Sequence, residues 1–181
     1  MIARQILAEL YSPLRHFVLM LRPVVVIPTT APRSCGADMN VETILHTKGR
    51  AVATIRPDET VDAAVKQLIA RNIGALVASE DGNRVDGIIS ERDIVHALAR
   101  HGSGLLTLTV AEVMTQPAVT CDPAESVGEL MAEMTNRRIR HFPVVRNGRL
   151  CGIVSIGDVV KNRLDEIEYE AKSLRSFISG G

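Results

Sequence analysis

Two serine and aspartate pairs lie at matching places in the sequence. Ser90 is followed three residues later by Asp93, and Ser155 by Asp158, each after a Gly-Ile-Ile or Gly-Ile-Val segment. This pattern places a hydroxyl and a carboxylate where a strand leads into a helix, beside backbone N–H groups that lack helical partners. Such a junction can bind a sugar or an anion. The same spacing also forms a capping box that only stabilises the helix, so the spacing leaves both interpretations open.

A cluster of cationic side chains distinguishes the second half of the chain. Arg138, Arg140 and His141 follow an amphipathic segment, whereas the first half has Arg-Asn-Ile-Gly-Ala at 71–75. Cations next to a cleft can hold a phosphate through charge-assisted hydrogen bonds. A helix carboxyl end also favours positive charge, which offers another explanation for Arg138. We expect Arg140 and His141 to face a phosphate beside Asp158, which lies in the same half.

A sequence repeat organises these residues from Met39 onward. Pro57 matches Pro123 at an offset of 66, and Asp93 matches Asp158 at an offset of 65. One extra residue near Asn83, in a predicted hairpin turn, explains the change of offset, because turns tolerate insertions. The lead-in segment 41–45 is repeated at 110–114.

Each repeat combines helical and strand periodicity. Thr60 and Ser126 are predicted helix N-caps, each followed by an apolar stripe, then a glycine turn between two short apolar runs, then a second helix. The predicted order is β-α-β-β-α, twice. About 60 residues bury too little surface to be stable alone, so the two units should pack sheet to sheet in an α/β (α+β) fold. The expected boundaries are 39–105 for the first repeat with its lead-in, 106–165 for the second, and 166–181 for a C-terminal helix and tail.

The ordered elements resemble a tandem pair of CBS domains, named after cystathionine β-synthase and often called a Bateman module. The matching stretches are residues 54–57, 73–77 and 87–93 in the first repeat and 119–123, 140–145 and 152–158 in the second. The resemblance covers about residues 40–165. It implies pseudo-twofold packing of two units, with two clefts that hold adenine nucleotides in many relatives.

The resemblance also implies roles for individual residues. The aspartate of each repeat would accept hydrogen bonds from ribose hydroxyls, the serine would support the sugar or phosphate, and a threonine would contact the base. These residues are Asp93, Asp158, Ser90, Ser155, Thr54 and Thr120. Gly74 and Ala75 would let an adenine ring approach the backbone, although tight packing explains them equally well. Lys48 could add a cation or lie in a solvated loop.

Composition argues against several other functions. Aromatic residues make up 3% of the chain, too few for a base-stacking surface, and residues 39–181 contain 17 basic against 19 acidic residues, so nucleic acid binding is not expected. The three cysteines show no CxxC spacing, which argues against a metal site and favours a reducing, cytoplasmic compartment. No catalytic motif is found, so an enzyme is not expected.

The two ends of the chain differ from the repeats. Residues 1–38 are expected to be a disordered or weakly docked extension, or a product of a start codon upstream of the real one. Their apolar run, Phe17 to Ile27, covers eleven residues, too few to span a membrane. The last helix predicts a homodimer, because its apolar residues recur at spacings of four and three, although the same stripe could fold back onto its own tandem. These residues are Val160, Leu164, Ile167, Ala171, Leu174 and Phe177 or Ile178.

Together these patterns predict a regulatory module. It would bind AMP, ATP or NAD(H) as a regulatory ligand, without a catalytic cofactor or a metal, and would transmit occupancy to an unknown effector protein. A nucleotide-handling enzyme and a purely structural dimerisation module are the alternatives.

Overall fold

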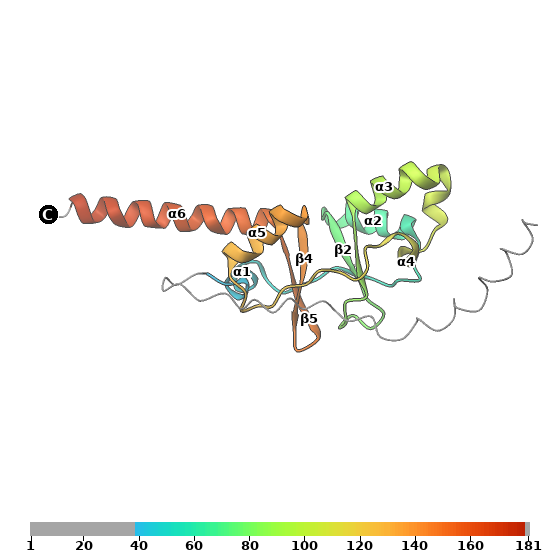
Figure 1. Cartoon of the computed structure of the whole chain (residues 1–181), viewed down its shortest axis with the longest axis horizontal. Helices are drawn as coiled ribbons and strands as arrows, with labels where there is room; N and C mark the ends of the chain where they lie inside the picture. The colour runs from blue at the N-terminus through green and yellow to red at the C-terminus, as the bar shows by residue number, and fades with distance from the viewer. Residues whose placement is uncertain (1–38, 180–181) are drawn as a thin grey trace, which may run out of the picture.

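Two similar units lie side by side in the computed structural model, which describes residues 39–179 (Figure 1). The expectations for residues 1–38, including the apolar run, lie outside this range. So do those for the side chains of Leu174, Phe177 and Ile178 at the end of the expected dimer seam. Within the described range, no helix is both long and apolar enough to cross a bilayer.

The first unit has a three-stranded sheet with the order β1-β2-β3. Strands β1 and β2 are parallel, and β2 and β3 form an antiparallel hairpin. Its elements, with the lead-in helix α1, are α1 (Val41–Lys48), β1 (Thr54–Ile55), α2 (Val61–Arg71), β2 (Ala75–Ala78), β3 (Gly87–Ser90), α3 (Glu91–His101) and the 3₁₀ helix η1 (Gly102–Thr107).

The second unit repeats this arrangement with a shorter first strand. Its elements are α4 (Val110–Val113), α5 (Val127–Arg137), β4 (His141–Arg146), β5 (Arg149–Ser155) and α6 (Ile156–Ser179). Strands β4 and β5 are antiparallel, and the strand equivalent to β1 is reduced to one parallel bridge between Cys121 and Val144. The expected α+β fold with a long C-terminal helix is confirmed.

Local sequence signals account for the helix ends. Thr60 Oγ1 accepts the Ala63 N–H at 3.2 Å, and Ser126 Oγ accepts the Glu129 N–H at 3.2 Å, so both predicted N-caps are confirmed. Helix α2 ends at Asn72 with φ 51°, and the equivalent α5 ends at Arg138 with φ 55°. The left-handed turn at Arg138 directs the chain into β4 and starts the cationic segment.

The lead-in helices pack on the opposite units. Val41, Ile44 and Leu45 of α1 lie in the core of the second unit, and Val110 and Val113 of α4 lie in the core of the first. Each exchange also pairs backbone groups at a helix start. The Val127 N–H donates to the Met39 carbonyl at 2.9 Å, and the Val61 N–H donates to the Leu108 carbonyl at 2.9 Å.

This exchange differs from the sequence expectation, in which each lead-in belonged to its own repeat. Helix α4 follows the first unit after the short η1 and packs on that unit. The two units are related by pseudo-twofold symmetry, so α1 packs at the equivalent place on the second unit. The units are therefore interlocked rather than merely adjacent.

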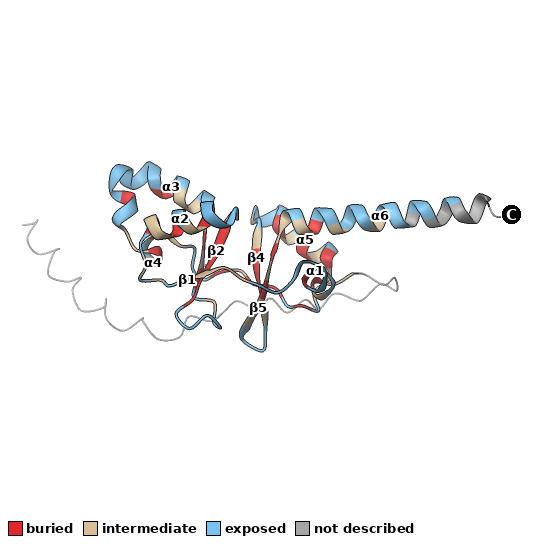
Figure 2. Ribbon diagram, turned by 180° about the vertical axis from the view of Figure 1, so that it is seen from behind, coloured by how far each residue is buried: buried red, intermediate tan, exposed pale blue. Residues whose placement is uncertain are grey.

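Burial differs strongly between the sheets and the outer helices. Buried residues concentrate on the strands and on the helix faces against them, whereas the described part of α6 that extends beyond the body is largely exposed (Figure 2). Several large apolar side chains of α3 and α6 are also exposed. These are Val95 (62%), Leu98 (52%), Val160 (46%), Leu164 (56%) and Ile167 (49%).

Candidate functional site

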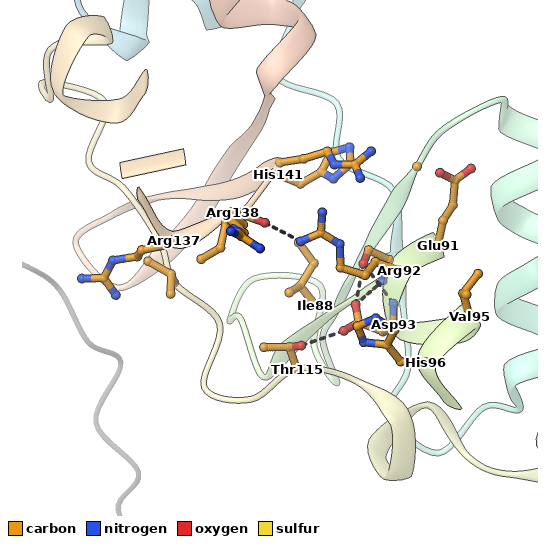
Figure 3. Close-up of a pocket in the computed structure, with 15 residues that line it drawn as sticks. Ile88, Glu91, Arg92, Asp93, Val95, His96, Thr115, Arg137, Arg138 and His141 are labelled. Carbon is orange, nitrogen blue, oxygen red and sulfur yellow. Dashed lines mark hydrogen bonds between the residues drawn. The ribbon is translucent and has the colours of Figure 1, made fainter. Parts of the chain in front are cut away.

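A cavity of about 480 Å³ lies between the two units. The first unit contributes the junction of β3 and α3, with Ser90 and Asp93, and the second contributes the segment 137–141 (Figure 3). Thr115 and Val119, from the segment between α4 and α5, complete the lining. The cleft therefore joins a strand-to-helix junction of one unit to a helix-to-strand turn of the other.

Asp93 accepts hydrogen bonds at both carboxylate oxygens. Its Oδ2 accepts the Ser90 N–H at 2.8 Å and the Ser90 hydroxyl at 2.5 Å, while the Ser90 Oγ accepts the Asp93 N–H at 3.4 Å. This is a complete capping box. Its Oδ1 accepts the Thr115 hydroxyl at 2.9 Å. Oδ2 therefore caps the helix, while Oδ1 holds a neutral hydroxyl that another hydroxyl could replace.

Arginines line both walls of the cleft. Arg92 Nη1 donates to the Arg138 carbonyl at 2.6 Å, which links the two units across the cleft. Arg137 Nε pairs with Glu133 at 2.5 Å along α5 and points away from Asp93 in Figure 3. The side chains of Arg138 and Arg140 are exposed. Four arginines line the cleft against two carboxylates, so its local charge is positive.

The cationic segment lies next to both junctions. The sequence grouped Arg140 and His141 with Asp158 of the same repeat, and His141 does pair with Ser155 in the β4–β5 hairpin. Both residues also line the cleft that contains Asp93, which the sequence did not predict. The reason is that the units face each other, so the turn of one lies opposite the helix start of the other. A repeat pattern does not reveal such a crossed arrangement.

His141 lies at the centre of the interface. Burial lowers its pKa more than the nearby Glu91 carboxylate raises it, so the imidazole is neutral at pH 7. Its ring packs on Gly74, where an added Cβ would lie 3.1 Å from Cε1. Gly74 therefore does allow a close approach, but in this structure the ring that approaches is His141. Ala75 is buried within β2.

The equivalent junction of the second unit holds an ion pair. Asp158 Oδ2 accepts the Ser155 N–H at 2.8 Å and the Ser155 hydroxyl at 2.7 Å, and the Lys48 ammonium lies 2.6 Å away. Burial raises the pKa of Asp158, but the hydrogen bonds from Lys48 and Ser155 outweigh it and keep the pKa below its usual value. Lys48 comes from α1, the exchanged lead-in of the first unit.

The structure thus brings together six of the candidate residues and leaves five outside this cleft. Gly74, Ser90, Asp93, Arg138, Arg140 and His141 line it; Thr54, Ala75, Thr120, Ser155 and Asp158 do not. Thr54 lies in β1 opposite Val77, and Thr120 is buried. Sequence reasoning missed Arg92 and Thr115. Arg92 lies between Ser90 and Asp93, and Thr115 directly follows the repeated lead-in. Both residues could therefore have been found from their places next to recognised motifs.

The described cysteines offer no reactive thiolate. Burial raises the pKa of the Cys121 and Cys151 thiols, which keeps them protonated at neutral pH. Over residues 39–179 there is also no group of three or more His, Cys, Asp or Glu side chains that could hold a metal. These observations give no support to redox or metal chemistry in that part of the chain.

Comparisons with known proteins agree on one family. The CBS domain model matches residues 41–100 and 110–165. The mitochondrial CBS domain-containing protein CBSX3 of Arabidopsis thaliana is 38% identical over 128 residues, which cover 68% of this chain and 62% of that protein's length.

Solved structures are similar over the same region. A CBS-domain-containing protein from Agrobacterium tumefaciens is 43% identical with a TM-score of 0.67, covering 74% of this chain and 99% of its own. A CBS domain pair solved in complex with 5′-methylthioadenosine and S-adenosyl-L-methionine is 29% identical with a TM-score of 0.62, covering 71% and 98%.

Proposed function

Because this chain belongs to the CBS-domain family, we propose that it binds an adenine nucleotide in the cleft containing Asp93 and transmits this occupancy to a partner protein. CBS pairs are regulatory modules, and one similar pair was solved with adenosine compounds. One observation carries the proposal. The Asp93 carboxylate, whose Oδ1 has only the neutral Thr115 hydroxyl as partner, lies in the same cavity as several arginines.

The proposed pose follows from these groups. A ribose hydroxyl replaces the Thr115 hydroxyl at Asp93 Oδ1, while Oδ2 keeps its cap on Ser90. The phosphates extend toward Arg138 and Arg140, whose exposed side chains can reorient to form charge-assisted hydrogen bonds. The neutral His141 donates a hydrogen bond from its ring. AMP, ATP and NAD(H) share these adenosine and phosphate features.

Salt should distinguish a nucleotide from a nucleoside in this cleft. We expect the affinity for ATP to fall several-fold between about 0.05 and about 0.5 M salt, while the affinity for adenosine changes little, because only ATP engages the arginines. Isothermal titration calorimetry measures both. The variant Arg140→Gln should show weaker salt dependence for ATP. Equal salt dependence of the two ligands in the wild type would exclude the arginines from a phosphate role.

We also propose that two chains pair through the apolar side of α3 and α6. Helices α3 and α6 lie along the same edge of the molecule in Figure 1, both carry exposed apolar residues, and the resemblance to CBS pairs implies dimers of this kind. Burying Ile167, now 49% exposed, would remove apolar surface from water.

The variant Ile167→Glu should therefore shift the protein from dimer to monomer. Light scattering at several protein concentrations measures the mass, and Tyr169→Glu is the control, since Tyr169 is exposed and lies off the apolar seam. The control should stay dimeric. A monomeric wild type, or an unchanged mass of Ile167→Glu, would overturn the proposed pairing.

The effector protein and a cytoplasmic location remain predictions. The location rests on the odd number of cysteines and their lack of CxxC spacing, and the name of one relative places that protein in mitochondria. The alternative of a purely structural module predicts that the cleft binds no nucleotide, so the titration above also tests it.

A further inference from the structure

We infer that Lys48 closes the second junction to nucleosides, so that each chain binds one nucleotide, at Asp93, rather than two. This inference rests on the proposed function, because it concerns which of the two junctions is used. It reverses the sequence expectation of two nucleotide clefts in which the one with Asp158 attracts the anion.

The first argument is the partner that each carboxylate already has. The Lys48 ammonium is 2.6 Å from Asp158 Oδ2, which also accepts both hydrogen bonds from Ser155. A ribose hydroxyl must displace a cation there, and the ammonium attracts the carboxylate by a Coulomb energy that a neutral hydroxyl lacks. At Asp93 the competing group is only the Thr115 hydroxyl, at 2.9 Å from Oδ1. A ribose therefore displaces its competitor far more easily at Asp93.

The second argument is the anchoring of Lys48. It is the last residue of α1, whose Val41 and Leu45 are buried in the core of the second unit. Gly49 ends the helix with φ 94°, so the chain turns away directly after the lysine. The side chains of Lys48 and Asp158 are 30% and 24% exposed, which limits screening of the pair by water. The exchange of lead-in helices thus holds this cation over the junction.

The third argument is the set of residues at equivalent positions. At the offset of 69 that relates the two lead-in segments, Lys48 corresponds to Pro117, so the first junction has no equivalent lysine. In the other direction, Arg92, Arg138 and His141 correspond to Gly157, Asn72 and Ala75. The junction at Asp158 therefore lacks equivalents of Arg92 and Arg138 as well as a free ribose acceptor, while His141 pairs with Ser155 in the β4–β5 hairpin and lies beside both junctions. If opened, it would recognise the sugar and base of a nucleoside but gain little from a phosphate.

The substitution Lys48→Met tests this inference, because it removes the ammonium and keeps an unbranched side chain of similar length. Titration calorimetry of the wild type should give one AMP per chain. Lys48→Met should give a second site that binds adenosine and AMP with similar affinity, and adding Asp158→Ala should remove it. Lys66→Met is the matched control, since Lys66 forms an exposed ion pair with Asp62 away from both junctions. It should keep one site.

A second variant keeps the test decisive if Lys48→Met does not fold. In the wild-type background, Asp158→Ala should leave the AMP affinity within about threefold, because its carboxylate is engaged by Lys48 and not by ligand. Three results would overturn the inference while leaving nucleotide binding intact. They are two AMP per chain in the wild type, one site per chain in folded Lys48→Met, and a tenfold loss of AMP affinity in Asp158→Ala. Absence of any binding to the wild type would instead overturn the proposed function and this inference with it.

Discussion

Replacing Leu45 with alanine is expected to lower the free energy of unfolding by about 2–5 kcal/mol, the usual cost of truncating a buried leucine. Leu45 is 1% exposed and lies in the core of the second unit with Leu130, Phe142 and Val154. Its methyl groups also pack closely on Gly152, where a Cβ would lie 2.6 Å from Cδ2. Truncation therefore leaves a cavity between α1 and β5.

Thermal unfolding and hydrogen exchange measure this effect. For a chain of this size the melting temperature should fall by about 2–4 °C per kcal/mol. Amide exchange should accelerate more in β4 and β5 than in β2 and β3, because α1 packs on the second unit. Leu106→Ala is the control, since Leu106 is 47% exposed, and it should change stability little. Faster exchange mainly in β2 and β3 would contradict the exchange of lead-in helices.

The second large effect is expected at Asp93. Alanine at this position should weaken AMP binding about ten- to a hundredfold, because hydrogen bonds to a charged group contribute about 1.5–3 kcal/mol. It should also cost about 1 kcal/mol of stability, because the Asp93 side chain completes the helix cap.

Asparagine separates these two contributions. Asp93→Asn keeps a side-chain oxygen for the cap but loses the carboxylate charge and one acceptor. Its melting temperature should therefore stay closer to that of the wild type while the AMP affinity remains reduced. Asp158→Asn changes the matching cap of the second unit and should keep the AMP affinity. Full affinity in both Asp93 variants would make Asp93 a helix cap and nothing more.

Local sequence signals predicted most of the fold. The caps at Thr60 and Ser126, the glycine turns and the alternation of periods all have local causes, and the structure contains them. The exchange of α1 and α4 was not predictable in this way. An amphipathic lead-in shows that a helix has an apolar face, but not which of two similar cores will bury it.

The candidate site was predictable in parts rather than as a whole. The sequence identified Asp93 and Asp158 as equivalent, because they occupy the same position in the two repeats. The repeat pattern does not show which other residues surround each of them. Their partners come from segments distant in the chain: Thr115 contacts Asp93, and Lys48 contacts Asp158. The crossing of Arg138 to the cleft of Asp93 likewise depends on how the two units meet. Tertiary contacts, not residue types, therefore make the two junctions unequal.

A crystal structure of the full chain grown with saturating ATP would test the central claim most directly. We expect ligand density in the cleft between the units, with the ribose hydroxyls at Asp93 Oδ1, the phosphates near Arg138 and Arg140, and the pair of Lys48 and Asp158 intact. Density at Asp158 with Lys48 displaced, or an empty cleft at saturating ATP, would contradict the account.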